Sequence, residues 1–218
     1  MSPDELTLDE LRAALAPLNA RNAVFDGWSE RALGASAAEI GVPASRARIA
    51  FPGGAADMID AWYASIDAAM AQAFPAERIA ALKIRHRIRD LVLFRIDHIE
   101  PVREAARRAL AVLAQPQNLV RGARLGWRSA DAMWRLAGDT ATDFNHYSKR
   151  AILSGVYGST LLVWLGDESD GRAETRAFLD RRIDDVMKIE KLKAGWRSRQ
   201  ERLPSLTRFL GRLRNPAQ

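Results

Sequence analysis

The chain of 218 residues has 33 basic and 27 acidic residues, a formal net charge of +6, a hydrophobic content of 48% and no cysteine. This length fits one domain, or one domain with a small appendage, and the hydrophobic content is enough for a core. The lack of cysteine excludes disulfides, thiolate metal sites and a cysteine nucleophile.

The positive charge is concentrated at the C-terminal end of the chain. From Lys191 onward there are eight basic residues and one acid, Glu201, so the rest of the chain is close to neutral. Electrostatic attraction to phosphates dominates DNA affinity, and a neutral body supplies little of it. A basic tail instead favours contact with an anionic surface.

The N-terminal sequence and the composition also suggest a cellular location. The first ten residues are acidic and contain no apolar run, which is typical of neither a signal peptide nor an arginine-rich transit peptide. Arginine far exceeds lysine and alanine is abundant, as in proteins encoded by GC-rich bacterial genomes. We therefore expect a protein of the bacterial cytoplasm, peripheral on the inner face of the cytoplasmic membrane.

The first part of the chain carries signals for three helices. A capping box at Thr7–Glu10 predicts a helix that continues to about Leu18. A second helix is predicted at 29–40 and, after a glycine turn, a short third helix ends near Phe51. This order resembles the N-terminal domain of TetR-type repressors, so we expect residues 1–54 to form a helix-turn-helix-like part.

That resemblance leaves a second function open, namely a TetR-type DNA-binding transcriptional regulator with a hydrophobic ligand. Arg46 and Arg48 on the short third helix would then read bases in the major groove. However, this helix contains no Asn, Gln or Lys, and the segment 50–54 lacks the basic and polar residues that such repressors use on phosphates. We therefore expect no nucleic acid among the partners.

The body of the chain, residues 55–195, shows helical spacing of apolar residues and no alternation typical of strands. Its first helices are predicted at 54–70, 76–98, 101–114 and 119–137, several of them with proline at the start. The predicted fold is all-α, a TetR-like bundle of about ten helices with a C-terminal amphipathic helix.

The uncharged segment between Arg150 and Asp167 predicts the central helix of the core. Apolar residues fall on every side of it, as in a helix buried all round, and it is shorter than the roughly 20 residues that cross a bilayer. Ala151, Gly155 and Ser159 recur every four residues and leave one side nearly bare. That side could pack against another helix, within the chain or across a dimer, or form a groove for a long apolar ligand.

One set of motifs is specific. It comprises Asp131-Ala-Met-Trp134, Ala137-Gly-Asp-Thr-Ala-Thr-Asp-Phe-Asn145, Tyr147, Lys149-Arg150 and Phe178-Leu-Asp-Arg-Arg-Ile-Asp-Asp-Val-Met187. These motifs resemble the lipid-binding accessory proteins of ubiquinone biosynthesis, the Coq-nine family. The resemblance is dense from about Leu119 to Lys191 and weaker but co-linear back to about Leu6.

The resemblance implies a TetR-like homodimer that binds isoprenoid quinone precursors at the membrane and presents them to the demethoxyubiquinone hydroxylase, alongside other ubiquinone-biosynthesis enzymes. In that family the partner-binding patch follows the Thr-Asp-Phe-Asn motif, where an aromatic pair precedes Thr-Arg-Arg. Here the pair is His146 and Tyr147, followed by Ser148, Lys149 and Arg150. The first aromatic of the pair is therefore replaced by histidine.

Two sets of candidate residues belong to these roles. The apolar candidates for lining a lipid site are Met133, Trp134, Leu153, Val156, Tyr157, Leu161 and Trp164. The candidates for partner binding are Asp143, His146, Tyr147, Lys149 and Arg150. We expect Tyr147 and Arg150 at the surface; the alternative is that Tyr147 caps the core and Arg150 pairs with Asp143 or Asp139.

The C-terminal part, residues 196–218, predicts an amphipathic helix that lies on a membrane. Its membrane-binding candidates are the apolar residues of one helical arc and a tryptophan placed for the headgroup level: Leu203, Leu206, Phe209, Leu210, Leu213 and Trp196. The alternative is that this part folds back on the body or on a partner.

The sequence contains no constellation typical of catalysis or metal binding. The three histidines, His86, His98 and His146, lack metal-ligand spacing, and no nucleophile elbow, phosphate-binding loop or dinucleotide fingerprint occurs. We therefore expect no enzyme activity, no cofactor and no metal, and we interpret the chain as a binding protein.

Overall fold

The structure is a computed structural model that describes residues 6–140 and 144–202. Every regular element in these residues is a helix, so the all-α prediction is confirmed. The α-helices are α1 (Leu8–Asp26), α2 (Glu30–Glu39), α3 (Ala44–Ala50), α4 (Ala55–Ala73), α5 (Ala76–Ala80), α6 (Ile84–Ile99), α7 (Arg103–Leu113), α8 (Leu119–Leu136), α9 (Phe144–Gly166) and α10 (Ala173–Arg202). Short 3₁₀ helices lie at Glu100–Val102, Pro116–Asn118 and Asp170–Arg172.

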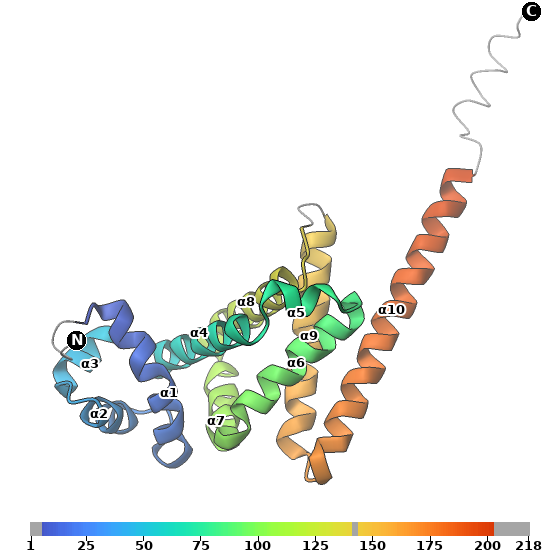
Figure 1. The fold of residues 1–218 in the computed structure, drawn as a ribbon. Coiled ribbons are helices and arrows are strands. Elements are labelled where there is room, and N and C mark those ends of the chain that lie inside the picture. The colour runs from blue at the N-terminus through green and yellow to red at the C-terminus, as the bar shows by residue number, and fades with distance from the viewer. Residues whose placement is uncertain (1–5, 141–143, 203–218) are drawn as a thin grey trace, which may run out of the picture. The chain divides into compact units, whose positions relative to one another are not determined.

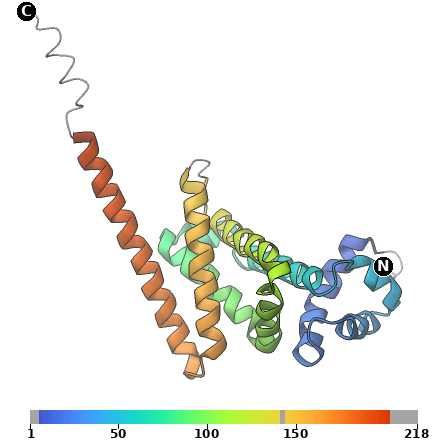
Figure 2. The same ribbon diagram turned by 180° about the vertical axis from the view of Figure 1, so that it is seen from behind.

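The chain divides into two units, Met1–Leu179 and Asp180–Gln218. In the first unit, α1, α2 and α3 lie at one end and α9 at the other (Figure 1). α4 contacts both α1 and α8, so it connects the N-terminal helices to the body. α8 and α9 pack against each other, and Figure 2 shows this pair from behind. The predicted division at residues 54 and 195 stays a prediction.

The N-terminal helix begins at the predicted capping box. The hydroxyl of Thr7 accepts from the backbone N–H of Glu10 (3.3 Å), and the Glu10 carboxylate accepts from the backbone N–H of Thr7 (2.8 Å). The helix continues to Asp26, beyond the predicted end, because Ala20 and Ala23 extend its buried face. Alanines are weak markers of a buried face, so the leucine spacing alone placed the end too early.

The helix predicted at 76–98 is in fact two helices, α5 and α6. Arg87 fixes the turn between them, since its Nε donates to the carbonyl of Leu82 (2.7 Å) and its Nη2 to that of Ala80 (2.8 Å). No glycine or proline marks this break, so the sequence pattern could not locate it.

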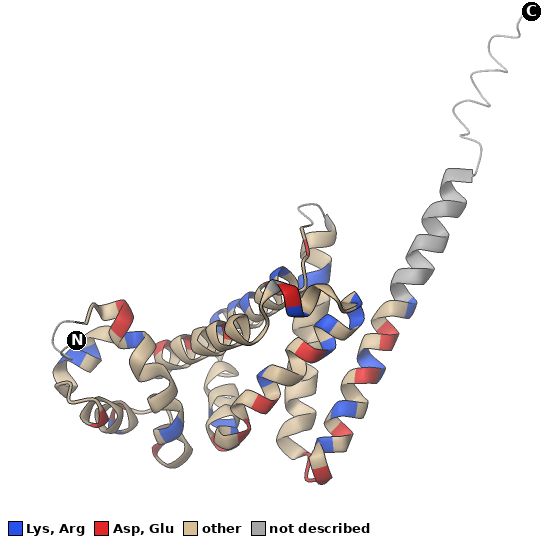
Figure 3. Ribbon diagram, in the orientation of Figure 1, with Lys and Arg blue, Asp and Glu red and all other residues tan. Residues whose placement is uncertain are grey.

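Charged residues connect the helices of the body. On α4, Asp57 pairs with Arg121 of α8 (3.0 Å) and Asp60 pairs with Arg128 of the same helix. Basic and acidic residues are interspersed along the described helices (Figure 3).

Candidate functional site

The described residues of the motif, 137–140 and 144–145, lie at the end of α8 and the start of α9, where the two helices form a junction. Arg150 of α9 is buried there, with 2% of its side chain exposed. Its Nε donates to Asp131 of α8 (2.6 Å), and its Nη1 donates to Asp139 in the turn after α8 (3.1 Å) and to the carbonyl of His146 (3.1 Å). One guanidinium thus connects α8, α9 and the turn after α8.

The surface position predicted for Arg150 is therefore wrong, and the alternative pairing with Asp139 is the one observed. Two carboxylates, from α8 and from the turn, hold the guanidinium inside. Lys149 also reaches Asp139, with Nζ 2.6 Å from Oδ1, and lies 5.3 Å from the centre of the Trp134 ring. Asp143, the remaining candidate of this group, lies outside the described residues.

Gly138 is required at this junction for two reasons. Its φ is +87°, a backbone conformation that favours glycine. A Cβ at this position would also lie 3.2 Å from Nη1 of Arg87, the atom that donates to the carbonyl of Ala137 (2.8 Å). Arg87 therefore ties α6 to the end of α8 across a glycine that leaves room for it.

Tyr147 lies at the surface, as predicted, with an exposed fraction of 60%. Its ring centre is 6.1 Å from that of Trp127 on α8 and 5.2 Å from that of His146. The sequence analysis missed Trp127, although a large aromatic residue off the buried face of its helix was an available signal. The structure thus brings Trp127 to the candidate patch and places Arg150 in the interior.

The seven candidates for a lipid site lie on α8 and α9. All of them except Trp134 are buried. Trp134 is half-buried and donates its indole N–H to the carbonyl of Lys149 (3.0 Å), while Trp164 donates to the Glu100 carboxylate (2.6 Å). The set therefore belongs to the interior of the body, and its contact with a lipid stays a prediction.

The central helix is not buried all round, contrary to the prediction. Ala151 and Gly155 are exposed, Ser159 is half-buried, and Leu162 on the same side has an exposed fraction of 66%. Small uncharged residues do not reveal from sequence alone whether solvent or another helix covers them. Within the described residues of the first unit this side of α9 is exposed, and the homodimer stays a prediction.

A buried polar cluster that the sequence analysis missed lies between α4, α6, α8 and α9. The side chain of Arg95 on α6 is 0% exposed; it pairs with Asp67 of α4, and its Nη2 donates to the hydroxyl of Ser129 on α8 (2.9 Å). Its guanidinium carbon lies 5.0 Å from the centre of the Tyr157 ring on α9. The available signal was a charge inside the apolar run 91–96.

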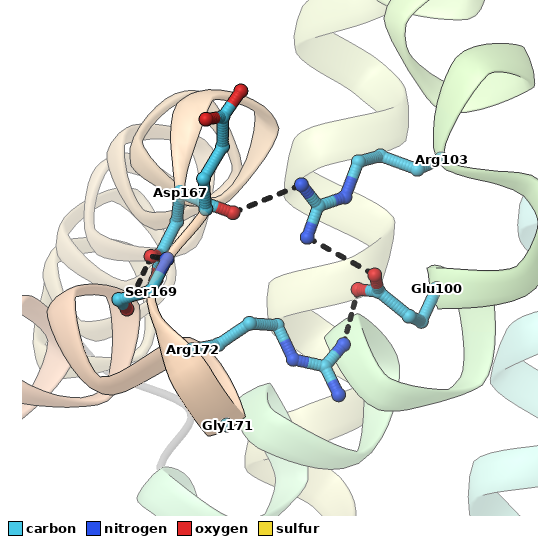
Figure 4. Close-up of a pocket in the computed structure, with 7 residues that line it drawn as sticks. Glu100, Arg103, Asp167, Ser169, Gly171 and Arg172 are labelled. Carbon is cyan, nitrogen blue, oxygen red and sulfur yellow. Dashed lines mark hydrogen bonds and ion pairs between the residues drawn. The ribbon is translucent and has the colours of Figure 1, made fainter.

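A cavity of about 540 Å³ lies between the start of α7 and the turn that joins α9 to α10 (Figure 4). Its lining is polar and charged: Glu100, Arg103, Asp167, Glu168, Ser169, Gly171 and Arg172. Arg103 and Arg172 both pair with Glu100, and Arg103 donates to the carbonyl of Asp167 (2.9 Å). This lining has the wrong character for an isoprenoid tail, so the cavity does not match the predicted lipid site.

Asp167 ties this turn to the start of α10. Its carboxylate accepts from the backbone N–H groups of Ser169 (2.9 Å) and Thr175 (2.8 Å) and from the hydroxyls of both residues. Burial alone would raise the pKa of Asp167, but these hydrogen bonds outweigh it and hold the pKa well below its ordinary value. The carboxylate is therefore an ionised structural anchor at neutral pH.

A smaller groove of about 280 Å³ lies between α1 and α4, with Arg128 of α8 at its edge. Its lining combines alanines with polar residues: Ala13, Ala61, Ala64, Ala68, Asp9, Arg12, Asp60, Ser65 and Arg128. None of the seven lipid candidates lines this groove or the larger cavity.

The arginines that would read DNA are engaged within the N-terminal helices. Arg46 donates to the carbonyl of Leu6, and Arg48 pairs with Glu30 of α2 (3.3 Å). Ile49, which lies beside them on α3, is exposed and apolar.

The membrane-binding candidates cannot be placed in the same way. Leu203, Leu206, Phe209, Leu210 and Leu213 lie outside the described residues, as does the side chain of Trp196. None of the helices in the described part of the chain is long and apolar enough to cross a membrane. Among the described side chains, no group of three or more His, Asp or Glu residues is arranged to hold a metal ion.

Comparison with known proteins shows what the chain is similar to. Residues 119–190 match the COQ9 family model. The rat protein named ubiquinone biosynthesis protein COQ9, mitochondrial, is 42% identical over 102 residues, which are 47% of this chain and 33% of the rat protein. The human protein of that name is 38% identical over 102 residues, 47% of this chain and 32% of its own. The chain thus spans about a third of the length of these relatives.

A longer match is found in Drosophila melanogaster. Its ubiquinone biosynthesis protein COQ9, mitochondrial, is 24% identical over 192 residues, covering 85% of this chain and 58% of the fly protein. The names of these relatives assign them to mitochondria, which contradicts the prediction of a bacterial cytoplasmic protein. That prediction rested on arginine and alanine content and on the lack of a targeting signal in the first ten residues, and neither feature determines a compartment.

The fold has a relative among solved structures. The crystal structure of a TetR transcriptional regulator from Nitrosomonas europaea superimposes with a TM-score of 0.63 at 22% identity, covering 79% of this chain and 95% of that one. An identity this low shows the fold alone, and it confirms the TetR-like prediction. The predicted resemblance to the COQ9 family is confirmed as well, since residues 119–190 match its family model and the chain has a TetR-like helical fold.

Proposed function

We propose that this protein is a non-catalytic accessory protein of ubiquinone biosynthesis, which binds isoprenoid quinone precursors and presents them at a membrane to the demethoxyubiquinone hydroxylase. The observation that carries this proposal is the COQ9 match over residues 119–190. That segment contains α8 and α9, and these two helices supply both the buried apolar candidates and the exposed Tyr147.

The lipid would bind against the buried sides of α8 and α9. Met133, Leu153, Val156 and Leu161 are buried there, so these packed side chains must move apart to admit an isoprenoid tail, whose own burial contributes about 25 cal/mol per Å² of apolar surface. A tail of several isoprene units can therefore be bound without any charged contact. The open, small-residue side of α9 is a different surface, and we assign it to close approach of a second copy.

The hydroxylase would bind where α8 meets α9. Tyr147 is exposed and contacts Trp127, and exposed aromatic residues are frequent anchors of protein interfaces. Arg150 supports this patch from inside by holding α9 against α8. The C-terminal part, residues 196–218, would bring the protein to the membrane surface through its basic amphipathic character.

The proposal is tested by thermal unfolding of lipid-free protein with added quinone precursors. We expect the precursor to raise the melting temperature, because a ligand that binds only the folded state stabilises it. Leu161→Phe adds volume on the buried side of α9 and should reduce this shift. Leu119→Phe makes the same change at an exposed position of α8 and should not reduce the shift. A wild-type melting temperature that no precursor changes would contradict lipid binding.

A further inference from the structure

Five buried side-chain atoms of the described residues make no hydrogen bond of ordinary geometry, and two of these atoms lie between α6 and α9. They are Nε of Arg95 and the hydroxyl of Tyr157, and both side chains are almost wholly buried. Buried polar groups in folded proteins are nearly always hydrogen-bonded, and each exception requires an explanation. Here the two exceptions belong to one cluster, because the guanidinium of Arg95 lies 5.0 Å from the centre of the Tyr157 ring.

The other contacts of Arg95 fix its orientation. Asp67 of α4 pairs with it, and the hydroxyl of Ser129 on α8 accepts from its Nη2 (2.9 Å). These contacts use the terminal nitrogens and leave Nε as a remaining donor. The position of the donor is therefore set by α4, α6 and α8, while α9 brings the Tyr157 hydroxyl.

Apolar residues complete the surroundings of this cluster. Met133 lies one helical turn after Ser129 on α8, and Leu153 and Leu161 lie one turn to either side of Tyr157 on α9. All three are buried, and burial also raises the pKa of Tyr63, which interacts electrostatically with Tyr157 and Arg95. An apolar interior with a few convergent polar groups is typical of small-molecule sites.

Asp67 and Arg128 lead from the cluster to the surface. Nε of Arg128 lies 3.5 Å from the Asp67 carboxylate, and Arg128 lines the groove between α1 and α4. Ala64 and Ala68, on either side of Asp67 in the sequence of α4, line the same groove. The cluster is therefore close to a surface hollow bordered by small side chains.

We propose that Arg95 and Tyr157 form the polar end of the lipid site and bind a ring oxygen of a quinone or of its phenolic precursor. Both groups donate hydrogen bonds, and a guanidinium always carries its charge, so the pair suits an oxygen acceptor on an otherwise apolar molecule. The isoprenoid tail then lies against the buried leucines of α9. This assignment rests on the proposed lipid-binding function and adds recognition of the head group to it.

The test compares two ligands delivered from the same detergent micelles: a ubiquinone with four isoprene units and the isoprenoid hydrocarbon of the same tail length without a ring. In Tyr157→Phe we expect the Kd for the ubiquinone to rise about tenfold, as for one lost hydrogen bond, with the Kd for the hydrocarbon unchanged. Tyr147→Phe removes the same hydroxyl from the exposed start of α9 and should change neither Kd.

Thermal unfolding without ligand is the second measurement. The Tyr157 hydroxyl makes no hydrogen bond of ordinary geometry, although it interacts with the Arg95 guanidinium, so Tyr157→Phe should lower the melting temperature only slightly. A clear decrease would show that the protein itself satisfies this hydroxyl and would overturn the assignment.

The remaining outcomes separate the two proposals. If the wild type binds both ligands and Tyr157→Phe binds them equally well, the Tyr157 hydroxyl does not donate to the quinone oxygen. The head-group assignment then fails, and lipid binding stands. Equal weakening of both ligands would also overturn the assignment, since the hydroxyl would then act on the tail. If the wild type binds neither ligand, the proposed lipid function fails together with the assignment.

Discussion

Arg150 and Arg95 are both buried arginines paired with aspartate, yet their surroundings differ. Arg150 contacts two carboxylates and a backbone carbonyl at the α8–α9 junction. Arg95 has one carboxylate, one hydroxyl and the face of a tyrosine, and its Nε has no partner. The contacts of Arg150 are made within the protein, without a ligand, and they hold α9 against α8. The arrangement at Arg95 leaves a donor available inside the protein, which is why we assign it to binding.

The largest effect is expected from removing the Arg150 guanidinium, which holds α9 against α8. Arg150→Met leaves the buried Asp139 carboxylate without its guanidinium partner, and breaking a buried ion pair by removing one member typically costs about 3–5 kcal/mol. Urea unfolding should show a loss of this size. A decrease in the free energy of unfolding of less than about 1 kcal/mol would mean that Arg150 does not hold the two helices together.

The exposed Tyr147 near Arg150 should show the opposite behaviour, with little effect on stability and a clear effect on binding. Tyr147→Ala removes an exposed ring, so the free energy of unfolding should change by no more than about 0.5 kcal/mol. Binding to the hydroxylase should weaken by about 2 kcal/mol, as for an interface anchor. The comparison is made by measuring the Kd and the urea midpoint on the same variant. Unfolding of the variant, or an unchanged Kd, would remove Tyr147 from the partner patch.

A backbone change at the junction should have an intermediate effect. Gly138→Ala introduces a Cβ at a φ of +87° and near Arg87, and the expected loss of stability is about 1–2 kcal/mol. Gly126→Ala is the matched control, since it lies within α8 and its Cβ would meet nothing within 4 Å. That control should stabilise the protein by about 0.5–1 kcal/mol, as for glycine to alanine in a helix. Equal effects of the two substitutions would contradict the special role of Gly138.

The smallest effect concerns Asp167, a carboxylate satisfied by hydroxyl and backbone donors. Its pKa in the folded protein lies below that of an unfolded aspartate, about 3.9, so the carboxylate stabilises the fold above that pH and loses this contribution as the pH falls further. Asp167→Asn should cost about 1 kcal/mol at pH 7, as for loss of a helix-start acceptor. The difference from wild type should shrink below about pH 4. A difference that persists unchanged to pH 2 would exclude an ionised Asp167 as its cause.

The local features of the fold were predictable because they depend on neighbours in the sequence. Thr7 and Glu10 marked the start of α1, and the dense motif around Gly138 and Asp139 carried the resemblance to the COQ9 family. The break between α5 and α6 was not predictable, since it depends on Arg87 and on backbone carbonyls with no residue signal.

The candidate site depends on contacts between helices that are distant in the sequence. Arg95 meets Asp67 and Ser129 only because α4 and α8 pack around α6. Apolar spacing predicts which face of a helix is buried, but not which charge on that face finds a partner. The same limit explains the wrong surface position of Arg150 and the missed contact between Trp127 and Tyr147.

Lipid binding between α8 and α9 is tested most directly by organic extraction of freshly purified protein, followed by mass spectrometry of the extract. We expect an isoprenoid quinone or one of its phenolic precursors in the extract of the wild type, and less of it from Leu161→Phe than from Leu119→Phe, which makes the same change at an exposed position of α8. An extract without any isoprenoid, or with equal amounts from all three proteins, would contradict a lipid site on the buried side of α9.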